Sequence, residues 1–492
     1  MIKGEYYFMK RKLRAVSMTL TVLFLCLVTL NLITVPAKAE TTYTIGTDVT
    51  FPPFEFANKQ NKYVGIDMDL IREIAKNQGF KVKIKPVGFN AAVQSVQSGQ
   101  LDGVIAGMNI TKERKATFDF SKPYFTSGVV MAVTKNSKIT KFSQLKGQKV
   151  AVKTGTSGAN YANAIKNKYG FKVVTFDDSN NMYEDVMTGN SVACFEDSPV
   201  MRYGIKQGIK LKILTKPVKS GFYGFAVRKG HNQKLLKSFN KGLANLKANG
   251  QYKKITEEYL GKDSLKKTDG TSDSSFFGLI KQNKSALWSG FKETIWLTVI
   301  SIILATVFGV FVGLIGVFPN KFLNGFSTTL IYIFRGLPLL VLALFIYTGI
   351  PSLIGQKIPA FIAGVITLML NEGAYIAAFV KGGINAVDTG QFEAAQSLGL
   401  SFGRTMRKVI LPQGIRIMIP SFINQFIITL KDTSILSIIG ILELTQTGKI
   451  IIARNLQGFK VWSIIAIIYL VLITLLTWLS NWVQKRSKLY EH

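Results

Sequence analysis

Few residues of this 492-residue chain have the types and spacing that covalent catalysis requires. His231 is the only histidine before the C-terminal His492, and Cys194 has no histidine nearby in sequence. No spacing of residues matches a metal site, and Gly448-Lys449 lacks both the glycine spacing and the following Ser or Thr of a phosphate-binding loop. The sequence therefore argues against a secreted enzyme and against an ATPase. We expect no metal and no cofactor bound by this chain.

Polar residues interrupt the apolar stretches that dominate the second half of the chain. They include Arg335, Asn371-Glu372 and Lys431-Asp432. Such side chains are costly in a bilayer, so each is expected to face a cavity or to hydrogen-bond a neighbouring helix. The stretches long enough to cross a membrane cover residues 294–318, 331–350, 359–380, 420–439 and 462–482. The sequence predicts an all-α membrane domain with five crossings.

The region before these stretches differs in composition. From residue 41 to about 267, strand-like apolar runs alternate with helical patterns in a Lys-rich context, which is typical of a soluble α/β fold. The chain contains only Cys26 and Cys194, so this region has a single thiol and no internal disulfide. The formal charge of +33 comes from lysines scattered among acids and apolar residues. This pattern favours a surface near anionic lipid or cell-wall polymer over a nucleic-acid partner.

The N-terminal segment has the features of an export signal. Basic residues precede an apolar run from Ala15 to Val35 and the small-residue pattern Ala37-Lys38-Ala39. We therefore expect residues 1–40 to be a signal peptide or a retained N-terminal anchor, followed by an exported solute-binding domain at 41–262. The Ser-, Thr-, Asp- and Gly-rich composition that follows predicts a flexible linker over 263–285. Residues 286–492 then form the membrane domain.

The segment from Glu393 to Gln413 is polar and basic although it lies between apolar runs. Helix formers are interrupted by Gly399, and a basic continuation leads to Pro412, which predicts two short helices on a membrane face. The spacing from Glu-Ala-Ala to Leu-Pro-Gln resembles the signature loop of ATP-binding-cassette (ABC) importer permeases. That resemblance implies that residues 391–415 dock on a cytoplasmic ATPase. The coupling residues it implies are Glu393, Ala394, Ala395, Gly399, Leu411 and Pro412.

Three motifs in the exported region resemble the polar amino-acid-binding proteins of the same importer class. They are 46–56 (GTDVTFPPFEF), 62–70 (KYVGIDMDL) and 107–121 (GMNITKERKATFDFS). The resemblance implies a type II periplasmic-binding-protein-like clamp of two α/β lobes that closes on its ligand. Lobe 1 would comprise about 41–130 and 222–262, and lobe 2 about 131–221. Crossovers near 127–133 and 222–228 would form the hinge.

The same resemblance implies an amino-acid ligand, whose two charges need partners when they are buried. Arg114 would bind the α-carboxylate with two hydrogen bonds, helped by backbone donors near Asn109 and in the turn that ends at Ser157. Taken without that motif, Arg114 would more often be a surface ion-pair residue. Asp197 would accept from the α-ammonium. Gly107 and Glu196 complete the implied set.

Selectivity for the ligand side chain is expected from Asp48 and Lys153. One acceptor and one donor match a carboxamide, so glutamine is the expected ligand. Phe51 and Phe89 would be apolar walls, although core packing is the more common role of a phenylalanine. Two departures from the family leave asparagine and protonated glutamate open. Asn109 stands where relatives commonly have Thr, and Glu196 stands where a glutamine-binding relative has His.

From about residue 291 onward the sequence resembles polar amino-acid permeases, although Ala378 and Lys381 replace an acid and an arginine that are usual in that family. Because the chain lacks a phosphate-binding loop, we expect ATP and Mg²⁺ to bind a separate ATPase. Five crossings are too few to enclose a path easily, so we expect the chain to pair with a second copy. Basic residues place the loop 391–415 and the C-terminus in the cytoplasm, and the binding domain outside the cell membrane. The loop 443–460 is also basic and weakens that assignment.

A ligand-gated channel or a membrane sensor could use the same clamp. In glutamate-receptor channels the pore interrupts the clamp sequence, whereas here the apolar spans follow a complete clamp. No carbonyl-filter sequence such as TVGYG occurs. We therefore expect a substrate-binding and permease subunit of an importer rather than an enzyme, with an amino-acid-gated channel or sensor as the alternative.

Overall fold

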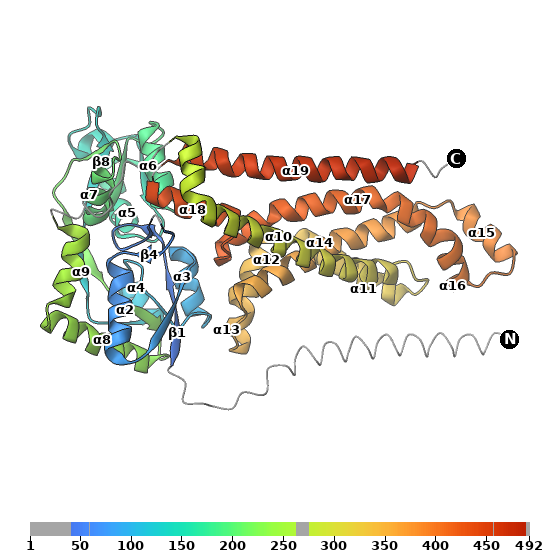
Figure 1. Ribbon diagram of the computed structural model, residues 1–492, viewed down its shortest axis with the longest axis horizontal. Helices are drawn as coiled ribbons and strands as arrows, with labels where there is room; N and C mark the ends of the chain where they lie inside the picture. The colour runs from blue at the N-terminus through green and yellow to red at the C-terminus, as the bar shows by residue number, and fades with distance from the viewer. Residues whose placement is uncertain (1–40, 59, 262–274, 456, 489–492) are drawn as a thin grey trace. The chain divides into compact units, whose positions relative to one another are not determined.

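A computed structural model describes residues 41–58, 60–261, 275–455 and 457–488 of the chain (Figure 1). The expected signal segment, 1–40, and most of the expected linker, 262–274, lie outside the described residues. The first described part is an α/β domain, and the second consists of helices. The coarse expectation of a periplasmic-binding-protein-like domain followed by a helical membrane domain is confirmed.

The first sheet of the α/β domain has the strand order β5-β1-β6-β14-β7. Its strands are β1 (Thr42–Thr47), β5 (Lys81–Pro86), β6 (Gly103–Val104), β7 (Phe118–Phe120) and β14 (Ala226–Arg228). Its helices are α2 (Ile66–Gln78), α3 (Phe89–Gln97), α4 (Lys112–Thr117), α8 (Gln233–Ala248) and α9 (Gln251–Leu260). Strands β1, β5 and β6 are parallel, so their carboxyl ends meet at one edge of the sheet.

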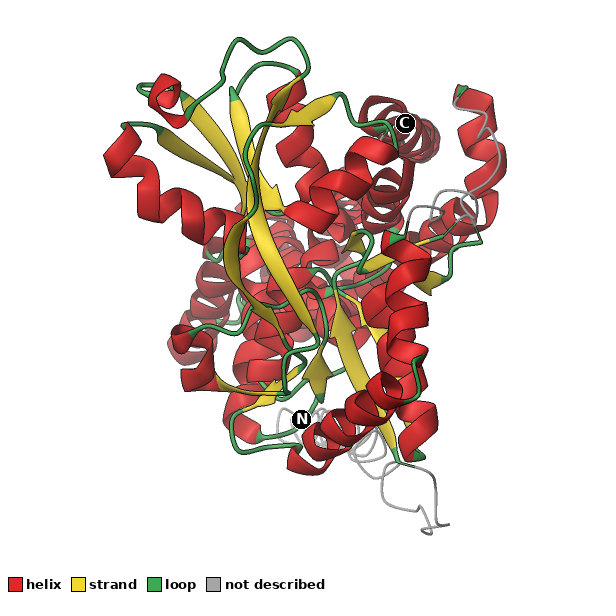
Figure 2. Cartoon of the chain, turned by 90° about the vertical axis from the view of Figure 1, so that its left-hand side faces the viewer, coloured by secondary structure: helices red, strands yellow, loops and turns green. Residues whose placement is uncertain are grey.

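The second sheet has the order β10-β9-β11-β8-β12, with β13 also paired to β8. Figure 2 draws the strands of the chain in yellow and its helices in red. Its strands are β8 (Phe125–Thr134), β9 (Lys149–Lys153), β10 (Lys172–Phe176), β11 (Ala193–Asp197), β12 (Leu211–Ile213) and β13 (Val218–Tyr223). Its helices are η1 (Phe142–Leu145), α5 (Ser157–Tyr169), α6 (Ser179–Met187) and α7 (Ser198–Lys206). The expected crossover segments form the antiparallel pair β8 and β13 and the strand β14.

A small third sheet contains β2 (Thr50–Phe51), β3 (Glu55–Ala57) and β4 (Tyr63–Val64). It carries buried aromatic residues, among them Phe51, Phe54 and Phe56. Phe54 packs edge-on against Tyr223 with ring centroids 5.1 Å apart. Phe54 lies in the turn between β2 and β3, so this contact packs the small sheet against β13 of the second sheet.

The membrane domain contains long helices that run alongside one another in Figure 1. Its elements are α10 (Phe276–Ile315), α11 (Lys321–Gly336), α12 (Leu339–Leu344), the π turn η3 (Phe345–Gly349), α13 (Ile350–Ile354), α14 (Ala360–Asn385), α15 (Thr389–Ser397), α16 (Phe402–Thr405), the π turn η4 (Met406–Ile410), α17 (Leu411–Asp432), η5 (Thr433–Ile439), α18 (Leu444–Asn455) and α19 (Gly458–Lys488). Among the described residues, four helices are long and apolar enough to cross a membrane, or up to five if a bent pair is one span.

Two boundaries differ from the sequence prediction. The second expected crossing, 331–350, is not one straight helix, because α11 and the segment that starts at Leu339 meet at 99°. Pro338 lacks a backbone N–H and disfavours a helical residue before it, which explains the break. The expected linker, 263–285, also ends too late. Helix α10 already begins at Phe276, where the side chain of Ser275 caps it by accepting from the Gly278 N–H.

Close helix packing in the membrane domain depends on glycines. A Cβ at Gly309 on α10 would lie 2.5 Å from the carbonyl oxygen of Gly373 on α14, and one at Gly313 would lie 2.8 Å from that of Ala377. Small residues four apart let two helix backbones approach closely. This spacing explains why α10 and α14 form the most extensive helix pair, and it fixes the position of α14, which carries Asn371 and Glu372.

Candidate functional site

A small cavity gathers most of the site residues expected from the sequence. It is lined by Asp48, Phe51, Phe89, Ala106, Gly107, Asn109, Arg114, Lys153, Gly155, Thr156 and Asp197. Asp48 directly follows β1, whereas Lys153 and Asp197 end β9 and β11. The cavity therefore lies at the carboxyl ends of parallel strands from both sheets, where ligands of open α/β folds usually bind. Its volume is about 10 Å³, which is close to the space of one water molecule.

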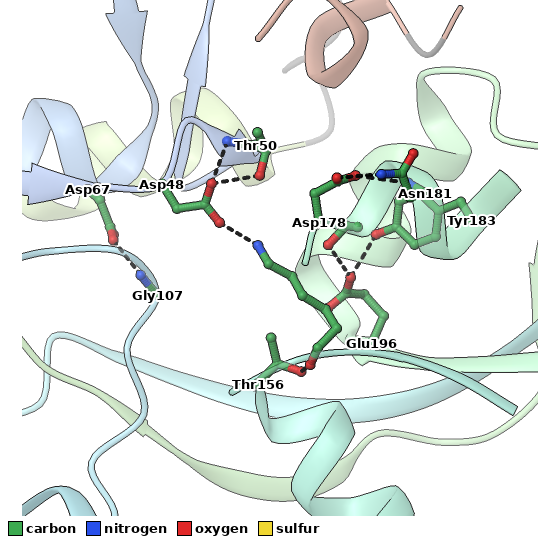
Figure 3. Close-up of polar contacts among 11 residues, drawn as sticks. Asp48, Thr50, Asp67, Gly107, Thr156, Asp178, Asn181, Tyr183 and Glu196 are labelled. Atoms are coloured by element: carbon green, nitrogen blue, oxygen red, sulfur yellow. Dashed lines mark hydrogen bonds and ion pairs between the residues drawn. The ribbon is translucent and has the colours of Figure 1, made fainter. Parts of the chain in front are cut away.

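Asp48 and Lys153 form a buried ion pair across this cavity (Figure 3). Asp48 also accepts from the Thr50 N–H at 3.1 Å and from the Thr50 hydroxyl at 2.6 Å, which fixes the carboxylate. Burial alone would lower the pKa of Lys153, but the attraction and hydrogen bond of Asp48 outweigh it and raise the pKa. The Lys153 ammonium also lies 4.9 Å from the centre of the Phe51 ring. The pair offers one fixed acceptor and one fixed donor.

Arg114 reaches the same cavity from helix α4. Its Nη1 donates to the carbonyl oxygen of Asn109 at 3.0 Å, and its Nη2 donates to that of Gly155 at 2.5 Å. The guanidinium lies 5.2 Å from the centre of the Phe89 ring. Burial lowers the pKa of Arg114 to about 10, and the nearby Glu113 opposes that shift. Arg114 thus stays charged at neutral pH and is held beside the cavity, as a carboxylate partner must be.

Asp197 presents a free carboxylate oxygen to the cavity. Its Oδ2 accepts from the Tyr223 hydroxyl at 2.5 Å, whereas its Oδ1 is buried and has no hydrogen-bond partner among the described residues. Burial raises the pKa of Asp197 to about 7, the repulsion of Glu196 adds to the shift, and the bonds from Tyr223 and Ser127 oppose it. An unpaired buried acceptor of this kind suits an ammonium group.

Two of the expected site residues lie outside the cavity lining. Ser157 accepts from the Asn109 side-chain amide instead of facing the cavity. Glu196 accepts from the hydroxyls of Ser179 at 2.8 Å and Tyr183 at 2.9 Å (Figure 3), and from the Asp197 N–H at 2.9 Å. Consecutive strand residues point to opposite faces, so Asp197 can face the cavity only if Glu196 faces away. Glu196 therefore supports Asp197.

Several residues of the site were not singled out from the sequence. Ala106, Gly155 and Thr156 line the cavity, and Tyr223 holds Asp197 from behind. Gly155 and Thr156 belong to the turn that was expected to face the ligand carboxylate, so that turn in the sequence could have identified them. Tyr223 belongs to the expected crossover but to no recognisable site motif. Its role appears only when β13 pairs with β8.

A second polar cavity, of about 410 Å³, lies among the membrane helices. It is lined by Arg335, Gly336, Leu337, Pro338, Leu339, Asn371, Tyr375, Gln425, Ile428 and Asp432. Arg335 lies 4.8 Å from the Tyr375 ring centre, and the Asn371 amide donates to the carbonyl oxygen of Phe334 at 2.9 Å. The fully buried Glu372 accepts from the Gln425 amide. Three of the expected polar groups, Arg335, Asn371 and Asp432, thus share one cavity.

Lys381, one of the departures from the permease family, has partners of its own. Its ammonium donates to the side chains of Asn324 at 3.1 Å and Thr328 at 3.0 Å on α11. Asn324 in turn donates to the carbonyl oxygen of Gly316 at 2.7 Å. Hydrogen bonds from this ammonium to neutral acceptors therefore hold α14 to α11 at this point.

The expected coupling loop has a helix, a turn and a second helix. Helix α15 ends before Gly399, which has φ of +79° and suits the left-handed turn. Pro412 does not end a helix, because it lies in the first turn of α17, and α16, η4 and α17 follow one another directly. Ala395 is buried, Leu411 is half-buried, and Glu393, Ala394, Gly399 and Pro412 are exposed. Leu398 is 84% exposed, so the turn presents an apolar side chain at the surface.

Comparison with known proteins assigns a family to both parts of the chain. Residues 43–262 match the bacterial extracellular solute-binding proteins, family 3, and residues 305–489 match the binding-protein-dependent transport system inner membrane component. The glutamine transport system permease protein GlnP of Escherichia coli (strain K12) is 36% identical over 213 residues, which cover 42% of this chain and 97% of that protein.

Two solved structures of substrate-binding domains are also similar. The second substrate-binding domain of a putative amino acid ABC transporter from Streptococcus pneumoniae is 48% identical, covering 44% of this chain and 99% of that one, with a TM-score of 0.36. Substrate-binding domain 2 of Lactococcus lactis GlnP is 46% identical, covering 46% of this chain and 98% of that one, with a TM-score of 0.37. The chain therefore belongs to the family of binding-protein-dependent transport system inner membrane components, and a family 3 solute-binding domain is fused before its permease domain.

Proposed function

We propose that this chain is the substrate-binding and permease subunit of an ABC importer for a polar amino acid, with glutamine as the preferred substrate. The permease relatives named for glutamine transport support the substrate class. The exposed turn around Gly399 supports docking on a separate cytoplasmic ATPase, which would bind ATP and Mg²⁺. The binding domain would lie outside the cell membrane, and the C-terminus inside.

The observation that carries this proposal is the set of charged groups in one cavity. Arg114 and Asp197 supply opposite charges for the α-carboxylate and the α-ammonium of an amino acid. Asp48 and Lys153 supply one acceptor and one donor for its side chain. A carboxamide inserted between Asp48 and Lys153 would donate to the first and accept from the second, so both buried charges would keep a partner. Glutamine offers all four groups.

The size of the cavity supports a clamp that opens and closes. A space of about 10 Å³ is too small for an amino acid, so the walls must separate before a ligand enters. Hydrogen bonds now join residues from the two expected lobes, as Arg114 donates to Gly155 and Asn109 to Ser157. The hinge at β8 and β13 would permit this opening. Ligand binding would then replace direct contacts between the lobes with contacts through the ligand.

Side-chain length and charge favour glutamine over its analogues. With the α-groups fixed at Arg114 and Asp197, the amide of asparagine would be one methylene short of the Asp48 and Lys153 pair. Ionised glutamate would place a carboxylate against Asp48, and like charges in a buried site repel. Arginine would place a cation against Lys153. We expect an affinity order of glutamine, then asparagine or protonated glutamate, then arginine.

The membrane domain would form a pathway with a second copy of the chain. The polar cavity around Arg335, Asn371 and Asp432 supports a hydrated route for a polar solute within the apolar helices. With at most five described crossings per chain, two copies would enclose that route and present two loops to two ATPase subunits. ATP-driven closure of the ATPase pair would move the helices on either side of Gly399.

Transport measurements test this function. Sealed inside-out membrane vesicles that contain the chain and its ATPase partner are loaded with radiolabelled glutamine, and the release of glutamine is followed after ATP is added. In a separate measurement in detergent, the stimulation of ATP hydrolysis by glutamine is determined. Glutamine-stimulated ATP hydrolysis supports the importer. Ionic conductance evoked by glutamine without nucleotide would instead indicate an amino-acid-gated channel.

A further inference from the structure

Two carboxyl groups, Glu55 and Asp67, are buried together behind the ligand cavity and have no part in the function described above. Glu55 lies on β3 and Asp67 in the first turn of α2, and each side chain is 0% exposed. Neither residue lines the cavity itself. Acidic side chains are almost never fully buried unless they are paired, so this location requires a physical explanation.

The hydrogen bonds around the two groups can be completed only with a proton between them. As carboxylates, both Glu55 oxygens and Asp67 Oδ1 would lack any donor among the described residues. Glu55 and Asp67 lie beside each other, because the Asp67 N–H donates at 2.9 Å to the carbonyl oxygen of Phe54, the residue before Glu55, and each carboxyl shifts the pKa of the other. Two carboxylates accept but cannot donate, so one group must be a carboxylic acid when the other is ionised. The pair thus requires one shared proton.

Asp67 is hydrogen-bonded to Gly107, which lines the ligand cavity. Its Oδ2 accepts from the Gly107 N–H at 2.8 Å (Figure 3) and from the Tyr124 hydroxyl at 2.7 Å. Gly107 lines the cavity with φ of +52°, and a Cβ there would lie 2.8 Å from the Phe51 ring. The chain direction at Gly107 is therefore fixed by Asp67 on one side and by Phe51 on the other. Asn109, two residues further on, bonds Arg114 and Ser157.

The two donors explain which group keeps the proton. Asp67 accepts from Gly107 and Tyr124, which stabilises its ionised form, whereas no donor reaches either Glu55 oxygen among the described residues. Burial raises the pKa of Asp67 to about 7, and it raises the pKa of Glu55 well above its usual value, with further repulsion from Asp67 and Asp48. Glu55 is therefore the acid and Asp67 the carboxylate near neutral pH.

The charged and titratable groups around the pair do not replace that proton. Lys153 attracts Glu55 but is already bonded to Asp48. Tyr124, Tyr223 and Tyr252 are the titratable neighbours from the other elements, and burial raises the pKa of each above its usual value. Loss of the shared proton would leave two facing carboxylates without a cation between them.

We propose that Glu55 and Asp67 form an acid–carboxylate pair whose single proton positions Gly107, so that amino-acid affinity decreases when alkaline pH removes that proton. Both are positioning residues, since neither touches the cavity. The inference rests on the proposed amino-acid binding, because its readout is glutamine affinity. When the proton leaves, repulsion between the two carboxylates would displace Asp67 and release the Gly107 N–H from its fixed direction.

Substitution of Glu55 by Gln tests this pair. The Gln amide still donates to Asp67 and fills the same volume, but it has no proton to lose. Full-length wild type and E55Q in lipid nanodiscs are titrated calorimetrically with L-glutamine from pH 7 to pH 9.5. The matched control is E257Q, which makes the same change at a side chain that is 62% exposed on α9.

The proposal predicts how the pH dependence of glutamine affinity differs between the variants, not the absolute pH profile of any one of them. Titration of the ligand's own ammonium weakens all three proteins equally, so it cancels in the comparison. Wild type and E257Q should lose about tenfold more affinity than E55Q by the alkaline end of the range. At pH 7, E55Q should bind glutamine within about threefold of wild type, because the hydrogen bond is retained. Parallel profiles for wild type and E55Q would contradict the proposal.

The proposal can also be tested if E55Q does not fold or if wild type does not bind glutamine. If E55Q does not fold, D67N is titrated in its place, because one carboxyl cannot form a like-charged pair and the additional alkaline loss should again be absent. An alkaline loss in D67N equal to that of wild type would overturn the pair. If wild type binds no glutamine at pH 7, the proposed substrate fails instead, and the same pH comparison is then made with L-asparagine and L-arginine.

Discussion

Lys153 at the end of β9 and Asp48 directly after β1 form an ion pair that joins the two sheets of the clamp with both side chains buried. Both charged groups stay buried at the strand ends and are not solvated. The pair therefore does two things at once, because it stabilises the closed clamp and it holds the acceptor and the donor that a carboxamide needs. Removing one member would leave the other charge buried and uncompensated.

Substitution of Lys153 by Met should destabilise the clamp by about 3–5 kcal/mol, because the Asp48 carboxylate loses its cation in a buried site. Glutamine affinity should fall at least about a hundredfold for the same reason. K229M is the matched control, since Lys229 pairs with Asp119 at 3.2 Å but is 57% exposed. It should change stability by less than about 1 kcal/mol. Thermal unfolding and calorimetry measure both effects, and equal losses in the two variants would contradict the role of the buried pair.

Glutamine affinity should increase with pH between 6 and 8 because of Asp197. Its pKa of about 7 means that it is mostly protonated at pH 6 and mostly ionised at pH 8, and only the carboxylate attracts an ammonium. The ligand must displace that proton, so affinity should rise about tenfold over this range. Calorimetry in buffers of different ionisation enthalpy would detect the released proton. A flat profile, or retained binding in D197N, would mean that Asp197 is not the ammonium partner.

The turn of the coupling loop depends on backbone conformation alone. At Gly399 φ is +79°, and a Cβ there would meet open space, so G399A should strain the backbone by about 1 kcal/mol without any steric clash. Glutamine-stimulated ATP hydrolysis should fall severalfold, whereas glutamine affinity should not change. G382A on α14 is the control, because a Cβ there also meets open space but the backbone is helical. Equal ATPase rates for G399A and wild type would contradict the assigned role of the turn.

Binding and translocation should be separable in the membrane domain. The Glu372 side chain is buried and accepts from Gln425, so E372A leaves an unpaired buried amide between α14 and α17. We expect uptake to fall at least about tenfold while glutamine affinity stays unchanged. E372Q can still pair with Gln425 and should retain most of the activity. A parallel loss of affinity and uptake in E372A would show that the helices affect the clamp itself.

The strand-end residues could be named from the sequence through its resemblance to the polar amino-acid-binding proteins. Asp48, Lys153 and Asp197 meet in one cavity because Asp48 follows β1 and the other two end β9 and β11. The alternation of side chains along β11 excludes Glu196 from the same face, and the sequence already contained that information. Whether the gathered residues bind an amino acid stays a prediction.

Other features depend on contacts between distant segments and had no local signal. The sharing of a proton by Glu55 and Asp67 requires β3 and α2 to bury both carboxyls. Nothing in the sequence around either residue indicates that its side chain is buried. Tyr223 reaches Asp197 only through strand pairing. The break after Gly336 had a local signal in Pro338, but hydropathy alone cannot distinguish a straight span from a bent one.

Calorimetric titration of the full-length chain in nanodiscs with glutamine, asparagine, glutamate and arginine tests the central claim most directly. We predict saturable binding with glutamine strongest, because only its side chain satisfies Asp48 and Lys153 together. A clear preference for arginine, or no binding of any amino acid, would contradict the account.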